Sequence, residues 1–239
     1  MRGRPKETPP VQLDAERFDV LTFDCYGTLI DWQRGIVDYL QPVLLRHDVH
    51  VIDDFILEFF AETETVVQAE GGRYEDVLRT VLRRFGTRLG FVPTEEELDG
   101  FPASLAAWPA FPDTLEALGR LAQRFELAVI SNTDDALFAR TNETLGVDFA
   151  HVVTAERTGV YKPDPHAFEV ALDAIGAKSS SVLHVAQSLY HDIAPAAAMG
   201  LATVWIDRNR GGPSAAPEAD AEPTWTFPTL GAFAEAVLA

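Results

Sequence analysis

The stretch from Phe18 to Trp32, FDVLTFDCYGTLIDW, constrains the fold of this chain more than any other. Residues 20–23 form a short apolar, β-prone run of the kind that is buried on both faces of a sheet. Asp24 stands where this run ends, and Gly27 and Thr28 follow with a turn residue and a hydroxyl that can bond to a loop carboxylate. Ligands bind beyond the carboxyl ends of strands in open α/β sheets, so Asp24 is a candidate nucleophile, base or metal ligand.

Strand-like runs return after residue 126 and alternate with helix-like segments. The runs cover 127–130, 149–153, 181–186 and 202–206, and the helices between them cover 136–145, 166–175 and 192–199. A loop over 209–224 precedes a last short strand and helix. Strands that alternate with helices of about ten residues predict an α/β fold with a parallel, doubly wound sheet.

The region between about 34 and 105 shows only helical periodicity. Apolar residues recur at helical spacing over 36–46, 54–68 and 74–89. A fourth helix is expected to open near Glu95, because Thr94 and the acidic residues after it suit a helix N-terminus. We therefore predict a helical cap over 34–105, inserted into a core formed by 18–33 and 106–239. Residues 1–17 are expected to form a flexible N-terminal tail.

The overall charge limits the classes of partner. Acidic residues outnumber basic ones 37 to 19, which gives a formal charge of −18 and no basic footprint for nucleic acid. No apolar run approaches the roughly 18 residues of a membrane span. Cys25 is the single cysteine, so no internal disulfide can form, and a cytoplasmic location is expected. The expected partner is a small molecule, and a homodimer is left open.

Polar residues follow three of the predicted strands. Asp24 follows the first, Ser131 and Asn132 follow the second, and Gln187 and Ser188 follow the fourth. A lysine, at position 162, stands in the loop before the helix over 166–175. Because parallel strands end at the same edge of a sheet, these residues are predicted to form one site.

The four motifs FDCYGTL, ISNTD, YKPDP and HVAQSLYHD occur in this order. With them the chain resembles the haloacid dehalogenase-like hydrolase superfamily over about 19–208, and the helical insert matches that family's cap. The resemblance implies that Asp24 is the nucleophile and that Thr28 and Ser131 supply two hydroxyl contacts. It also implies that Lys162 is the family's lysine and Asp192 its final acid.

Two positions depart from the magnesium-dependent phosphatases of the superfamily. These phosphatases carry an aspartate two residues after the nucleophile, which protonates the leaving group, and a magnesium-binding aspartate directly after the fourth strand. Here the first position is Tyr26, which is no ready acid near neutral pH. The second is Gln187, a neutral group that suits a hard cation poorly. No metal site and no cofactor are therefore expected, and a magnesium-dependent phosphatase is kept as an alternative.

The pattern D-x-Y-G-T-L resembles the L-2-haloacid dehalogenase branch. In that branch the aspartate attacks the α-carbon of a 2-haloacid and displaces halide, and water then cleaves the resulting ester without a metal. The resemblance implies the same chemistry on a small 2-substituted carboxylic acid, with Lys162 keeping Asp24 ionised and Asp192 handling the water. Substrate contacts are expected from Tyr26, Phe60, Asn132, Gln187 and Ser188.

The chain also departs from this branch at substrate-facing positions. The cap arginine that receives the substrate is absent from residues 59–63, and Phe168 and Leu189 replace a tyrosine and an asparagine. Arg34 or Arg73 is a candidate for the missing cation. Two alternatives stay open: a ring-opening hydrolase of azetidine-2-carboxylate, and a small-acid binder without turnover. Roles for Tyr190 and His191 are also open, and His184 is expected in the core.

Overall fold

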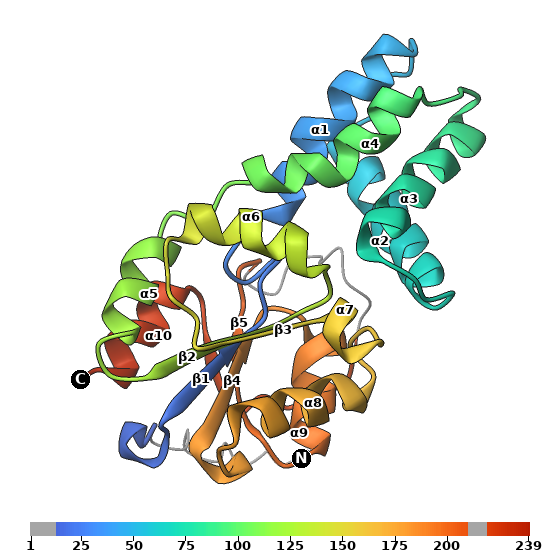
Figure 1. Cartoon of the computed structure of the whole chain (residues 1–239). Coiled ribbons are helices and arrows are strands. Elements are labelled where there is room, and N and C mark those ends of the chain that lie inside the picture. Colours follow the sequence, from blue (N-terminus) through green and yellow to red (C-terminus); the bar gives the residue numbers. More distant parts are fainter. Residues whose placement is uncertain (1–12, 210–218) are drawn as a thin grey trace, which may run out of the picture.

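The computed structural model describes residues 13–209 and 219–239, and it contains a six-stranded sheet with helices on both faces (Figure 1). The strand order is β3-β2-β1-β4-β5-β6, and every pairing is parallel. This confirms the predicted doubly wound sheet. The strands are β1 (Val20–Phe23), β2 (Glu126–Ser131), β3 (His151–Thr154), β4 (Val182–Ala186), β5 (Ala202–Ile206) and β6 (Trp225–Phe227).

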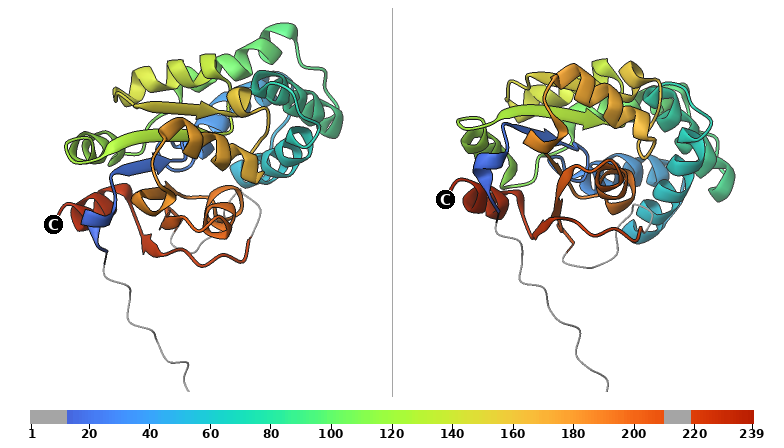
Figure 2. Two further views of the ribbon diagram at one scale, coloured as in Figure 1. Left: turned by 60° about the horizontal axis from the view of Figure 1, so that its bottom comes forward. Right: turned by 90° about the horizontal axis from the view of Figure 1, so that it is seen from below.

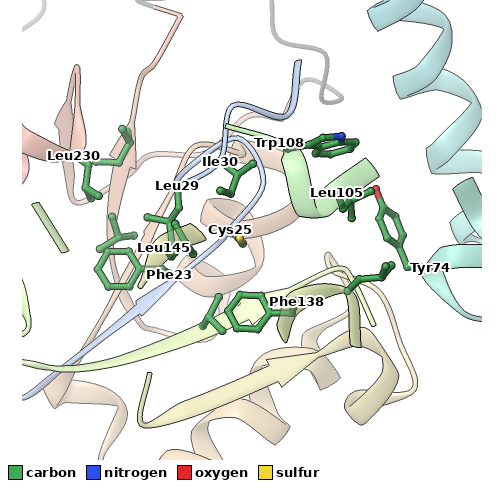
Figure 3. Packing of buried hydrophobic residues seen from close by; sticks show 14 of the residues in the cluster. Phe23, Cys25, Leu29, Ile30, Tyr74, Leu105, Trp108, Phe138, Leu145 and Leu230 are labelled. Carbon is green, nitrogen blue, oxygen red and sulfur yellow. The ribbon is translucent and has the colours of Figure 1, made fainter. Parts of the chain in front are cut away.

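The core divides between the two faces of the sheet because alternate residues of each strand point in opposite directions. On one face, Val20 packs in a small cluster beneath α8 (Pro165–Ile175) and α9 (Ala194–Ala198). On the other, Phe23 and Cys25 join a larger cluster with Phe138, as Figure 3 shows. Helices α5 (Thr114–Leu121), α6 (Asp135–Leu145) and α10 (Leu230–Val237) cover this second face. Cys25 is fully buried, so it serves as core packing.

Four helices form the region predicted as a cap, and they gather beside one end of the sheet (Figure 2). The first begins at Trp32, earlier than the periodicity indicates, because the Asp31 side chain accepts a hydrogen bond from the N–H of Arg34 and caps it. The helices are α1 (Trp32–Arg46), α2 (Asp53–Gln68), α3 (Tyr74–Leu89) and α4 (Glu95–Ser104), and a 3-10 turn, η2 (Leu105–Ala107), leads back to the core.

Three local details differ from the sequence prediction or lie beyond it. A one-turn helix, α7 (Ala155–Thr158), follows β3, and the helix expected over 192–199 divides into a π-helical turn, η4 (Leu189–Ile193), and α9. Residues 1–12 of the predicted N-terminal tail lie outside the described residues, and a 3-10 turn, η1 (Ala15–Arg17), precedes β1. Residues 210–218 of the predicted loop also lie outside them.

Glu97 ties the first turn of α4 to the end of α1. Its carboxylate accepts hydrogen bonds from Arg46 Nε at 3.1 Å and from the N–H of Thr94 at 3.0 Å, and it pairs with His47 Nε2 at 2.9 Å. The Thr94 hydroxyl accepts the N–H of Glu97 in return, which completes a capping box. Burial alone would raise the pKa of Glu97, but these hydrogen bonds outweigh it and lower the pKa to about 2.

Glu97→Gln should therefore lower the free energy of unfolding by about 1–2 kcal/mol at pH 7, the cost of a lost cap and its charged hydrogen bonds. Because the folded-state pKa lies below the ordinary value of 4.5, the stabilisation is present above pH 4.5 and is lost as the pH falls toward 2. Urea unfolding at several pH values measures the difference. Glu96→Gln, an exposed neighbour, is the control, and an equal loss in both variants would contradict the assignment.

Candidate active site

Asp24 lies directly beyond the carboxyl end of β1, at the centre of a buried ionic cluster. The Lys162 ammonium donates hydrogen bonds to Asp24 Oδ1 at 2.9 Å, to Asp192 Oδ1 at 2.6 Å and to the Ile130 carbonyl at 2.8 Å. Thr28 Oγ1 donates to the other Asp24 oxygen at 2.7 Å. The structure thus brings together Asp24, Thr28, Lys162 and Asp192, which the sequence places in three separate loops.

Burial and charge act in opposite directions on this cluster. Burial raises the pKa of Asp24, and Asp192 adds to this, while Lys162 and the Thr28 hydroxyl offset only part of the shift. Burial disfavours the charged form of Lys162, yet the two carboxylates keep its pKa above the ordinary value. For Asp192, burial is outweighed by Lys162 and His184, so its pKa is lowered. Lys162 is therefore an ammonium. Its charge opposes the rise that burial causes in the pKa of Asp24 but does not cancel it.

Asp192 has one engaged and one free carboxylate oxygen. Its Oδ1 is bound by Lys162 and by His184 Nε2 at 3.1 Å, while its Oδ2 is buried with no hydrogen-bond partner in the described part of the chain. The other ring nitrogen of His184 bonds to the Thr22 hydroxyl at 2.9 Å. His184 is fully buried, as predicted, but it also orients Asp192. The free oxygen of Asp192 can accept a proton or hold a water.

The polar residues after β2 position the cluster. The side-chain amide of Asn132 donates to the Lys162 carbonyl at 3.0 Å and accepts the Lys162 N–H at 2.7 Å, so it fixes the backbone of the lysine loop. Asn132 also lines the active-site cavity, where substrate contact was predicted. The Ser131 hydroxyl is buried and has no hydrogen-bond partner in residues 13–209 or 219–239. Its predicted role as a hydroxyl contact in catalysis stays a prediction.

The cavity above Asp24 is small and is lined by both core and cap. It measures about 70 Å³, room for roughly five waters at the 10–15 Å³ that each requires. The core supplies the ionic cluster with Gln187, Ser188 and His191, and the ends of the cap supply aromatic walls. The lining residues are Asp24, Tyr26, Trp32, Ala61, Glu64, Thr65, Gln68, Tyr74, Trp108, Asn132, Lys162, Gln187, Ser188, His191 and Asp192.

Tyr26 and Gln187, the two positions that depart from the phosphatases, both line this cavity. The Tyr26 hydroxyl bonds to Thr141 Oγ1 at 2.9 Å, and burial raises its pKa far above neutrality, so it cannot act as an acid. The backbone N–H of Gln187 donates to Thr28 Oγ1 at 2.9 Å. Ser188 holds the turn that follows, because its hydroxyl accepts the N–H of His191 at 3.0 Å.

The cap face of the cavity was missed by the sequence analysis. Phe60 was predicted to contact substrate, but it is fully buried behind the Trp32 ring, 5.7 Å away between ring centroids, and does not line the cavity. The prediction is wrong because Phe60 packs against Trp32 and Phe101 in the cap core. The residues of α2 that do face the cavity recur at intervals of three and four, which is the signal that could have revealed them: Ala61, Glu64, Thr65 and Gln68.

Neither candidate for the missing cap cation reaches the cavity. Arg34 is exposed and pairs with Asp38, and Arg73 pairs with Glu75 and Asp134. Lys162 is the single lysine or arginine in the described lining. His191 adds no positive charge, because burial, with Lys162 nearby, lowers its pKa to about 4. A substrate anion thus meets no unpaired basic side chain in this cavity.

The cluster does not fit the magnesium ion that the phosphatases of this fold family imply. Magnesium prefers several oxygen ligands in octahedral geometry. The Lys162 ammonium instead lies between Asp24 and Asp192, within hydrogen-bond distance of both, and the third acidic ligand position is the neutral Gln187. Within residues 13–209 and 219–239 no three acidic, histidine or cysteine side chains converge on a possible metal position. The residues present fit a pair of carboxylates joined by an ammonium, not a magnesium site.

Known proteins resemble this chain in sequence or in fold. An (S)-2-haloacid dehalogenase of Pseudomonas sp. strain YL is 29% identical over 201 residues, covering 79% of this chain and 82% of that protein. The structure of L-2-haloacid dehalogenase from Xanthobacter autotrophicus with chloropropionic acid covalently bound has a TM-score of 0.77 at 20% identity, covering 92% and 98% of the two chains. A Bacillus subtilis HAD-hydrolase bound to magnesium also reaches 0.77, at 19% identity and 93% and 100% coverage.

The last of these neighbours means that the fold alone does not decide whether a metal is used. Among the described residues, no helix is both long and apolar enough to cross a bilayer. The family model for haloacid dehalogenase-like hydrolases matches residues 18–200, which is most of the chain and includes all four loop motifs. The chain belongs to the haloacid dehalogenase-like hydrolases.

Proposed function

We propose that this hydrolase uses Asp24 to displace a leaving group from the α-carbon of a small 2-substituted carboxylic acid, as a 2-haloacid dehalogenase does, without a metal. The observation that carries the proposal is the position of Lys162 between Asp24 and Asp192 at the floor of a small cavity. An ammonium there stabilises the ionised form of the nucleophile.

The reaction proceeds in two displacements. An oxygen of Asp24 bonds to the α-carbon while the bond to the leaving group breaks, and the electron pair departs with that group. Water then adds to the carboxyl carbon of the ester and gives its proton to Asp192, whose free oxygen faces no other partner. The bond between the Asp24 carboxyl carbon and the oxygen attached to the substrate then breaks, and the departing alkoxide takes the proton from Asp192 and leaves as a 2-hydroxy acid. The remaining proton of the Asp24 carboxyl group passes to solvent, which regenerates the carboxylate. One water is consumed in each cycle.

The relatives support a covalent step of this kind. The Pseudomonas protein is an (S)-2-haloacid dehalogenase, and the Xanthobacter dehalogenase structure holds chloropropionic acid covalently. Displacement at the nitrogen-bearing carbon of a strained ring, as in azetidine-2-carboxylate, is a second candidate. It is favoured by the acidic lining, because Asp24, Glu64 and Asp192 face a single basic side chain.

We expect turnover to survive treatment with a metal chelator. Purified enzyme would be assayed with 2-haloacids, fluoroacetate, azetidine-2-carboxylate and a generic phosphate ester, each with chelator and with added magnesium. Release of halide, or opening of the ring, at equal rates in both conditions supports the proposal. Phosphate release that requires magnesium would replace it with a phosphatase, and absence of turnover on the whole panel would favour a binding protein.

A further inference from the structure

Glu64 of the cap helix α2 lines the cavity but takes no part in the reaction described above. Tyr74 at the start of α3 donates a hydrogen bond from its hydroxyl to Glu64 Oε1 at 2.5 Å. Tyr74 is itself anchored to the core, since its backbone N–H donates to Asp134 Oδ1 at 2.9 Å. The second oxygen of Glu64 has no hydrogen-bond partner in the described part of the chain. Glu64 is therefore a positioned carboxylate with a free acceptor.

The single lysine of the cavity lining has no N–H group left for a substrate. An ammonium has three N–H groups, and Lys162 directs its three hydrogen bonds to Asp24, Asp192 and the Ile130 carbonyl. The lining contains three carboxylates against this one ammonium. A simple anion such as a haloacid would enter a negative cavity with no free basic side chain to balance its charge. A substrate that brings its own positive charge avoids this cost.

We propose that Glu64 selects substrates that carry an ammonium group as well as a carboxylate, so that the substrate class of this site is amino acids and not simple haloacid anions. Glu64, which lines the cavity, accepts a hydrogen bond from the ammonium through its free oxygen. The inference rests on the proposed function for the reaction at Asp24, but it concerns binding alone.

Burial raises the pKa of Glu64 to about 7, although the Tyr74 hydrogen bond opposes the shift. Ammonium binding should accordingly strengthen as the pH rises through 7 and weaken below it. The tyrosines that face Glu64, Tyr74 and Tyr161, stay neutral over this range because burial raises their pKa values. The remaining titratable groups of the lining are Asp24, Tyr26, Lys162, His191 and Asp192.

Among these groups, Asp24 is the other carboxyl group whose pKa, like that of Glu64, is raised. The pH profile alone therefore does not assign the effect, and a Glu64 variant is required. Two isosteric ligands isolate the charge: L-alanine, which carries an ammonium on its α-carbon, and isobutyrate, which carries a methyl group there. Neither has a leaving group for Asp24, so the wild-type enzyme can be used. Quenching of Trp32 and Trp108, which line the cavity, reports binding.

At pH 8 the wild-type enzyme should bind L-alanine about tenfold or more tightly than isobutyrate, the scale of one charged hydrogen bond. In Glu64→Gln the ratio should fall to near one, and in the wild-type enzyme it should fall toward that value at pH 5.5. Tyr74→Phe keeps the charge and removes the donor, so the midpoint of the pH dependence should move upward. Glu62→Gln, an exposed carboxylate on the same helix, is the matched control and should leave the ratio unchanged.

The proposal is overturned if isobutyrate binds as well as L-alanine in the wild-type enzyme, if L-alanine does not bind at any pH, or if Glu64→Gln preserves the ratio. These outcomes are independent of turnover. Preference for L-alanine in an enzyme without carbon-displacement activity would refute the proposed function and leave the role of Glu64 standing. Efficient turnover of haloacids by an enzyme that shows no preference for L-alanine would support the proposed function and refute the role of Glu64.

Discussion

Asp24→Asn should abolish turnover, with a loss of roughly 10⁴-fold or more, the scale seen when a covalent nucleophile is removed. A neutral amide is a far weaker nucleophile than a carboxylate, and the substitution also removes the charge that Lys162 contacts at 2.9 Å. Rates of product release under saturating substrate measure the loss. Asp19→Asn, an exposed residue at the opposite end of the same strand, should retain full activity.

Heavy-oxygen water distinguishes a nucleophilic Asp24 from a general base. If Asp24 forms an ester, water attacks its carboxyl carbon, and the oxygen that leaves with the product was originally its own. One turnover in labelled water should then place the label on the peptide that contains Asp24, and the product should be unlabelled. Label in the first-turnover product with an unlabelled Asp24 would mean that water attacks the substrate directly.

The core half of the site could be predicted from the sequence because strand ends are visible as apolar runs that stop at polar residues. Asp24 and Gln187 follow β1 and β4, and Ser131 is the last residue of β2; these three strands are adjacent in the sheet. Parallel strands bring such residues to one edge whatever the details of packing. The lysine loop required the motif pattern as well, since nothing in its local sequence indicates that Lys162 is buried between two carboxylates.

The cap half could not be predicted in the same way because it depends on the rotation and tilt of helices. Phe60 and Glu64 lie one helical turn apart on α2, yet the first is fully buried and the second lines the cavity. Helical periodicity places both residues on nearly the same face of α2 and does not show which of them packs in the cap core and which reaches the cavity. The burial of His184 was predicted, but its contact with Asp192 was missed for a different reason. Its pairing with Thr22 across β1 and β4 depends on a strand register that the sequence does not give.

Asp192→Asn should slow hydrolysis of the ester roughly 10²-fold or more, in the range that general bases contribute, and should slow ester formation much less. The two steps are affected differently because of the charges around Asp24. The negative charge of Asp192 raises the pKa of Asp24, so its removal favours the ionised nucleophile. The same change removes the free buried oxygen that accepts the proton of water.

The ester should accumulate in Asp192→Asn as a result, with a burst of leaving group of one equivalent per active site followed by slow turnover. Acid quenching and intact-mass measurement should find an adduct with the mass of the substrate less its leaving group, on the peptide that contains Asp24. Asp173→Asn, an exposed residue of α8, is the control and should show neither burst nor adduct. An equal loss in both steps with no adduct would mean that Asp192 acts by holding Lys162, to which it is bonded at 2.6 Å, and that another group activates the water.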